Sequence, residues 1–239
     1  MKELSGSLEV KAFETVDGGS YNDVIMSGMG KIKGNIEATV VEVNGVGEIT
    51  GDIKSESLMV AGSFTADKEV VLEGMLNIKG TASFSKTLIC EEIIVAGSLS
   101  VKGDIKFTDA SISGALISRG ILTGDKVEVA GGVDMSSDLR VNYVNISFSE
   151  KSSVNDILAD EVYIETMEGK KGLFSKLKKT VFKCNEIRAE KVFVENTECK
   201  LIVADEVIIG ENCKVEKVEY LEKFEFAKSS EVKETVCKK

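Results

Sequence analysis

The sequence predicts an all-β protein, a right-handed parallel β-helix (solenoid) with coils of about 17 residues. Two patterns and one absence support this prediction. Glycines recur at a spacing of 17, apolar residues hold fixed places between them, and the chain contains no proline. Proline cannot donate to a hydrogen-bond ladder, so a chain made of central strands avoids it. The glycines form two series, offset by a one-residue insertion near Glu73: Gly28, Gly45 and Gly62, then Gly80, Gly97, Gly114 and Gly131.

Apolar residues occupy four fixed positions after each of these glycines, and we expect each position to form an interior column. Eight residues after the glycine stand Ile36, Ile53, Val70, Leu88, Ile105, Leu122 and Leu139. Thirteen after it, or fourteen in the cycle with the insertion, come Val41, Leu58, Leu76, Ile93, Ala110, Val127 and Val144. Two further on come Val43, Val60, Ile78, Val95, Ile112, Val129 and Ile146. A looser column, four after the glycine, holds Ile32, Ile49, Ala66, Phe84, Val101, Ser118 and Met135.

The spacing within one cycle indicates short strands joined by corners. Pairs such as Val41 and Val43 are two residues apart, which is the period of a strand with one buried face. Glycines supply corners, where positive φ is often needed. A second recurring glycine, at Gly34, Gly51, Gly103 and Gly120, marks a further corner. Three short strands and three corners then make one coil, and coils stack at ~4.8 Å.

Other solenoids fit this spacing less well. A left-handed β-helix of the acyltransferase type uses six-residue units and a catalytic histidine, and this chain has no histidine. Leucine-rich repeats need asparagine ladders and longer units. Right-handed β-helix sugar lyases use longer coils with acidic and basic clusters.

The stretch from Ile25 to Phe64, IMSGMGKIKGNIEATVVEVNGVGEITGDIKSESLMVAGSF, resembles the bactofilin domain, whose coils repeat short units of glycine and hydrophobic residues. The resemblance covers Ser20 to Met167. It implies a compact right-handed β-helix that polymerises end to end without nucleotide. It also implies a cytoskeletal or membrane-associated scaffold in bacteria. The chain departs from the family pattern because it lacks proline-bearing tails and continues beyond the first helix.

Four segments follow from these patterns: a lead-in strand (1–19), the main β-helix (20–168), a basic amphipathic insertion (169–183) and a second, shorter β-helix segment or cap (184–239). Residues 170–183 hold six lysines and no acidic residue. Leu173, Leu177 and Val181 share one helical face. Such a helix binds an anionic membrane surface, packs its apolar side on the solenoid, or contacts an acidic partner. The candidate contact residues are Lys170, Lys171, Leu173, Phe174, Lys176, Leu177, Lys178 and Lys179.

The segment after this insertion resumes strand-like alternation at a shorter, less regular period. The expected two-residue core pairs are Val192/Val194, Val207/Ile209 and Val218/Tyr220. The sequence leaves open whether these coils stack on the main helix or fold beside it. The final residues, SSEVKETVCKK, suggest a frayed or capping end.

The composition argues against most catalytic chemistry. Without histidine, the chain lacks the usual general acid–base and a common zinc ligand. The stretch GMGKIKG around Gly28 and Gly30 matches a phosphate-binding loop only loosely, and acidic pairs such as Glu91/Glu92 or Asp160/Glu161 fit a solvated face. Cys184, Cys199 and Cys213 fit a column of buried thiols better than a metal site. We therefore predict no catalytic residue, cofactor or bound metal.

Three hypotheses for function remain. The first is a self-assembling scaffold whose partner is itself. The second is a non-polymerising adaptor that recruits a membrane or protein through residues 170–183. The third is a carbohydrate-active enzyme, for which no catalytic cluster is evident. The formal charge of −10 argues against nucleic acid as a partner. No signal peptide or apolar run indicates export or insertion, so we expect a cytoplasmic protein, with the inner face of the cell membrane as a site of attachment.

Overall fold

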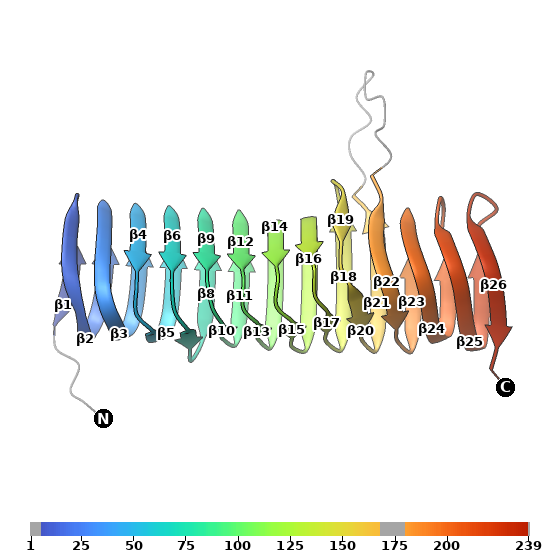
Figure 1. Ribbon diagram of the computed structural model, residues 1–239, viewed down its shortest axis with the longest axis horizontal. Helices are drawn as coiled ribbons and strands as arrows, with labels where there is room; N and C mark the ends of the chain where they lie inside the picture. The colour runs from blue at the N-terminus through green and yellow to red at the C-terminus, as the bar shows by residue number, and fades with distance from the viewer. Residues whose placement is uncertain (1–5, 168–179, 239) are drawn as a thin grey trace, which may run out of the picture. The chain divides into compact units, whose positions relative to one another are not determined.

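The computed structural model describes residues 6–167 and 180–238, and all regular structure in them is β-strand. The chain divides into two compact units, Met1–Gly120 and Ile121–Lys239. Each unit is a solenoid of parallel turns (Figure 1). The predicted all-β parallel solenoid with coils of about 17 residues is therefore confirmed, and the right-handed sense stays a prediction.

Unit 1 contains short strands that recur once per turn on each face. The strands are β1 (Ser7–Val10), β2 (Glu14–Met26), β3 (Met29–Val43), β4 (Val46–Ile49), β5 (Ile53–Val60), β6 (Ser63–Ala66), β7 (Val70–Leu72), β8 (Met75–Ile78), β9 (Thr81–Phe84), β10 (Leu88–Ile89), β11 (Glu92–Val95), β12 (Ser98–Val101), β13 (Ile105–Lys106) and β14 (Asp109–Ser118). Strand β3 lies beside β5, with Ile36 opposite Ile53 and Val41 opposite Leu58. Each pair is 17 residues apart, as the glycine spacing predicts.

The one-residue insertion lies where the sequence predicts it. Ser55 is opposite Leu72, a separation of 17, whereas Leu58 is opposite Leu76, a separation of 18. The extra residue is therefore taken up between Leu72 and Leu76, around Glu73. The strands on either side keep their columns, because a corner absorbs the added length.

The four predicted columns form the core. Every residue in them is buried, with at most 5% of its surface exposed. The sequence analysis missed a fifth column two residues after the repeat glycine: Phe64, Ala82, Leu99, Leu116 and Val133. Glycines hold this position in the first turns, which hides the pattern. Buried Met26 compensates there, since a Cβ on Gly47 would lie 2.9 Å from its Sδ.

Close approach of the backbone, more than positive φ, explains the glycine corners of unit 1. A Cβ on Gly45 would clash with the carbonyl oxygen of Gly28, and a Cβ on Gly62 would clash with that of Gly45. Among the repeat glycines of this unit only Gly34 (φ 93°) and Gly114 (φ 146°) have positive φ. The prediction of positive φ at the corners is thus wrong for most of them, because turns stacked this closely leave no room for any side chain.

Unit 2 is built in the same way. Its strands are β15 (Leu122–Thr123), β16 (Lys126–Met135), β17 (Leu139–Arg140), β18 (Tyr143–Phe148), β19 (Ser152–Ser153), β20 (Asp156–Leu158), β21 (Glu161–Thr166), β22 (Phe182–Arg188), β23 (Lys191–Val194), β24 (Thr197–Ile209), β25 (Lys214–Phe226) and β26 (Glu231–Cys237). Val144 lies opposite Val162, so the coil continues after the glycine phase fades, as predicted. Val162 lies opposite Val192, a step of 30 residues that spans the sequence between β21 and β22.

The predicted shorter period holds for one turn, in which Cys184 lies opposite Cys199 at a separation of 15. The last turns return to longer steps, with Cys199 opposite Val215 at 16 and Val215 opposite Val232 at 17. Four of the residues expected in core pairs, Val192, Val194, Val207 and Ile209, are buried, as is Val218. Tyr220 is only half-buried, because the turn beyond it is incomplete. The final residues form β26, a regular parallel strand on β25, so the frayed end is wrong and the capping end stays a prediction.

Candidate functional site

The predicted contact residues of the basic segment, Lys170 to Lys179, lie outside the described residues. The described residues that follow lead into strand β22 of unit 2. Phe182 begins β22 and is fully buried, with its ring centroid 5.8 Å from that of Phe148. Lys183 points outward and its Nζ lies 2.6 Å from Glu198 Oε2. No helix in 6–167 or 180–238 is long and apolar enough to cross a membrane.

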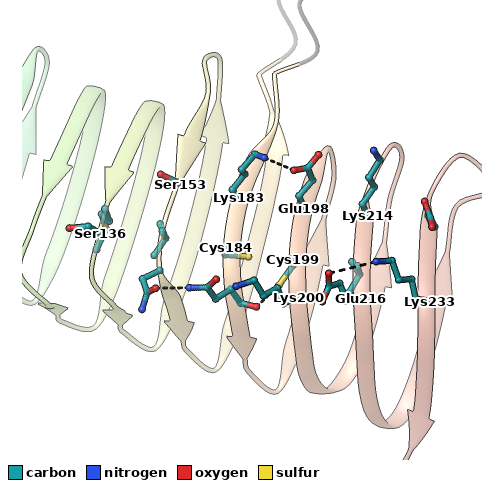
Figure 2. A pocket seen from close by; sticks show the side chains of 16 residues that line it. Ser136, Ser153, Lys183, Cys184, Glu198, Cys199, Lys200, Lys214, Glu216 and Lys233 are labelled. Atoms are coloured by element: carbon teal, nitrogen blue, oxygen red, sulfur yellow. Dashed lines mark hydrogen bonds and ion pairs between the residues drawn. The ribbon is translucent and has the colours of Figure 1, made fainter.

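Unit 2 carries a groove of about 840 Å3 along the outer face of its turns. Figure 2 shows the rows of outward side chains that line it, with Lys183 paired to Glu198 and Glu216 paired to Lys233 at 3.6 Å. The hydrogen bond from Lys183 lowers the pKa of Glu198. Charges of opposite sign on successive turns neutralise each other, so the groove has the character of a solvated, salt-bridged face.

Two thiols form the floor of this groove. Cys184 and Cys199 lie opposite each other on β22 and β24, and both are buried. A hydrogen bond with Cys199, together with burial, raises the pKa of Cys184 well above its ordinary value. The predicted thiol column thus holds for this pair, whereas Cys213 lies in another column, two positions before the partner of Cys199. Buried, protonated thiols are poor nucleophiles.

The glycines and acidic pairs considered in the sequence analysis have structural roles or lie on the solvated face. A Cβ on Gly28 would lie 2.7 Å from the backbone of Ala12, and one on Gly30 would clash with Val10, so backbone and core fill the loosely matched phosphate loop. Glu91 and Glu92 are exposed on the outer face. Among the described residues, no three cysteine, aspartate or glutamate side chains gather where they could hold a metal ion.

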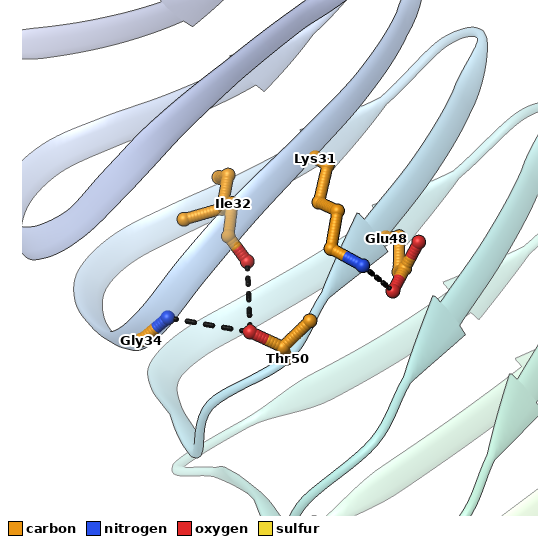
Figure 3. A network of polar contacts seen from close by, with 5 residues as sticks. All are labelled: Lys31, Ile32, Gly34, Glu48 and Thr50. Carbon is orange, nitrogen blue, oxygen red and sulfur yellow. Dashed lines mark hydrogen bonds and ion pairs between the residues drawn. The ribbon is translucent and has the colours of Figure 1, made fainter.

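Polar side chains in unit 1 tie one turn to the next. In Figure 3, Lys31 is paired with Glu48 on the following turn. The Thr50 hydroxyl donates to the carbonyl oxygen of Ile32 at 3.4 Å and accepts from the Gly34 N–H at 3.4 Å. These contacts link one turn to the next around the core, so the polar groups that make them serve a structural role.

The most unusual surface is the C-terminal end of unit 2. Strand β26 covers only the first part of β25, from Lys214 to Tyr220. The second part of β25, which ends at Phe226, has β24 on one side and no strand of the described chain on the other. Unpaired backbone groups therefore lie along an open edge, which is a template for another strand.

Aromatic side chains crowd this open edge. Phe224 and Phe226 continue the columns of Val207 and Ile209, which are fully buried one turn earlier. Phe226 is 53% exposed. The ring of Phe224 stacks on that of Phe226 at 5.5 Å and on that of Tyr220 at 5.3 Å. Two interior columns thus emerge at the surface as stacked aromatic rings.

No family model, curated protein or solved structure matches this chain. The description of the site therefore rests on geometry. Sequence reasoning missed the aromatic end, although the alternation in YLEKFEFA gave a signal: phenylalanines stand where earlier turns have valine and isoleucine.

The N-terminal end of unit 1 is also open. From Glu14 to Tyr21, β2 has β3 on one side and no described strand on the other. The end presents half-exposed Val16 and Tyr21, and the Tyr21 ring lies against Gly19, 3.0 Å from where a Cβ would stand.

Proposed function

We propose that this chain is a non-enzymatic bacterial cytoskeletal scaffold that assembles by end-to-end stacking of its β-helices. The open aromatic end of unit 2 carries the proposal. Phe224 and Phe226 occupy interior positions with no described turn above them, and the strand that bears them has an edge without a partner among the described residues. Stacking a further turn would bury the rings and pair the free backbone groups of the edge. Association would therefore remove the exposed apolar surface and the unpaired hydrogen-bonding groups together.

The resemblance to bactofilins supports the same function and adds three expectations. These are a right-handed coil, assembly without nucleotide, and a cytoplasmic location at the inner face of the cell membrane. Right-handed crossovers are also the usual form between parallel strands of one sheet. The buried thiols and the salt-bridged outer carboxylates favour a structural protein over an enzyme.

Negative-stain electron microscopy and sedimentation of the purified chain, in moderate salt without nucleotide or metal, test the proposal. We expect filaments or sheets that pellet. Phe226→Ser should move most of the protein to the supernatant without lowering its melting temperature, because the ring is already half exposed. Leu158→Ser is the matched control, since Leu158 is 40% exposed on the outer face of β20 and should leave assembly intact. Uniform small particles of the wild type would contradict the proposal.

The alternative is a non-polymerising adaptor that binds an anionic membrane or an acidic protein through residues 170–183. The six lysines and absence of acidic residues in this segment favour it. Flotation with anionic liposomes should carry the wild-type chain upward and leave a Lys176→Glu, Lys178→Glu, Lys179→Glu variant at the bottom. Flotation of both would rule out this segment as the contact.

A further inference from the structure

We infer that the open C-terminal end of one copy takes the N-terminal end of a second copy, so that the contact is head to tail. This inference rests on the proposed end-to-end assembly and identifies which ends meet. It follows from the places at which strand pairing stops and starts within the turn. The last pair of β26 joins Cys237 to Tyr220, and the first pair of β1 joins Ser7 to Asp23.

The two ends carry the same turn, residue for residue. The strand pairs within each unit, together with the 17-residue columns of the sequence that run on from Ala110 to Val127, give the position of each residue in the turn. Phe224 has the position of Leu8, Phe226 that of Val10, Val232 that of Val16, and Cys237 that of Tyr21. Each pair differs by the same number, since 224 − 8, 232 − 16 and 237 − 21 all equal 216. No residue need be added or removed for the N-terminal turn to lie in register on the C-terminal one.

A head-to-tail contact continues the interior columns in the way that each unit already does. It places the exposed ring of Phe226 over Val10, Phe224 over half-exposed Leu8, and Val232 over Val16. The small residues Gly19 and Ser20 would receive Thr235 and Val236. Both open edges would gain a parallel partner, as the strands within each unit have. A two-fold contact between like ends would instead set strands antiparallel and break the columns.

Charge favours the same arrangement over contact between two N-terminal ends. Residues 6–23 contain Glu9, Glu14, Asp17 and Asp23 against Lys11, a net charge of 1 − 4 = −3. Residues 222–238 contain four lysines and four glutamates, a net charge of zero. Two N-terminal ends would therefore repel each other, whereas the C-terminal end would not repel an N-terminal one.

The common register also makes specific charge pairs. Lys233 would stand opposite Asp17. Glu9 would stand opposite Glu225, but each of these carboxylates already has its own lysine, at 3.2 Å in both cases. The contact therefore adds an attractive pair and leaves no unpaired like charges in opposition.

The exposed thiol of Cys237 provides the test. The other four cysteines are buried, so Cys237 is the reactive one among the described residues. A strand stacked in register lies ~4.8 Å away, within the Cα separation of a disulfide. Tyr21→Cys in a Cys237→Ser background supplies the N-terminal thiol alone, and the wild-type chain supplies the C-terminal thiol alone. The two proteins, with tags of different size, are co-assembled and oxidised with diamide, which accepts the two electrons and two protons released.

The expected product is a covalent heterodimer that forms only in the mixture. Tyr21→Cys with native Cys237 should give a ladder of multimers on a non-reducing gel. Homodimers of the wild-type chain would mean that tails meet tails, and homodimers of the Tyr21→Cys, Cys237→Ser chain would mean that heads meet heads. Either overturns the head-to-tail contact while the pelleted assembly keeps the proposed function. If nothing pellets, both are overturned.

A second pair guards against loss of assembly through Tyr21 itself. Asp17→Cys and Lys233→Cys, each in a Cys237→Ser background, place the thiols on the outer face, where both residues are exposed. The same heterodimer in the mixture is expected. Its absence from assemblies that pellet normally would contradict the head-to-tail contact.

Discussion

Replacement of a single interior residue by aspartate tests the column arrangement most directly. Ile105 is fully buried and lies opposite Leu88 in unit 1. Removing its side chain costs about 2–5 kcal/mol. The new carboxyl must also be kept neutral in an apolar site. At pH 7, with an ordinary pKa near 3.9, this adds about 3.1 × 1.36, or roughly 4 kcal/mol. The total of about 6–9 kcal/mol is comparable with the whole stability of a typical domain, about 5–15 kcal/mol.

We therefore expect Ile105→Asp to abolish or strongly reduce soluble, folded protein at pH 7. Urea unfolding followed by far-ultraviolet circular dichroism measures the effect. Burial raises the pKa of the introduced carboxyl in the folded state, so the penalty is full above that pKa and disappears as pH falls toward the unfolded pKa. Lowering the pH from 7 to 5 should recover up to about 2.7 kcal/mol relative to the wild type. Ile105→Asn should show no such recovery.

The matched control is Lys106→Asp, one residue further along the same strand. Lys106 is exposed on the outer face, so this variant should unfold within about 0.5 kcal/mol of the wild type. If Ile105→Asp unfolds at the same urea concentration as the wild type, the assignment of inward and outward positions is wrong. If both variants fail equally, the defect lies in the added charge and not in burial.

Three further predictions concern corners, thiols and charge pairs. Gly62→Ala should cost about 1–3 kcal/mol in thermal unfolding, because its Cβ would meet the Gly45 carbonyl, whereas Gly74→Ala, with one contact at 3.0 Å, should cost less. Burial raises the pKa of Cys90 to about 12, so a thiol reagent at pH 8 should label Cys237 rapidly and Cys90 only after unfolding; rapid native labelling of Cys90 would refute its burial. The pKa of Glu198 is lowered by Lys183, so its contribution is present above the unfolded pKa and lost as pH falls through the folded one; Lys183→Met should raise that pKa in an NMR titration and cost under about 1 kcal/mol.

The fold could be predicted because the residues that set its 17-residue period can be replaced by few other residue types. A corner such as Gly45 admits no side chain, and an interior position such as Val41 requires an apolar one, so both recur in the turns of unit 1. The fifth column could not be seen, since Gly30 and Gly47 hold its first places and buried Met26 fills the space from a neighbouring position. That compensation is a packing effect, and spacing alone does not encode it.

The candidate site was harder to predict than the fold. The basic segment attracts attention in the sequence because its charge differs from its surroundings. The aromatic end does not, because Phe224 and Phe226 keep the same alternation as buried pairs such as Val207 and Ile209. What sets them apart is that β26 pairs with β25 only as far as Tyr220, so no described strand lies over them. The change from valine and isoleucine to phenylalanine is visible in the sequence, and the three-dimensional course of the last turn shows that these two positions are uncovered.

Val162 and Val192 lie opposite each other although 30 residues separate them in the sequence. The length of chain in a turn can therefore vary while the stacking of the strands stays the same. The turns on both sides of this step keep the same columns. The position of a residue in the core therefore depends on its place within a turn and not on the number of residues between turns. Extra chain at a corner costs mainly loop-closure entropy, which grows by only about 0.6 kcal/mol for each doubling of length. A corner of this solenoid can therefore take up chain of different length without altering the core on either side.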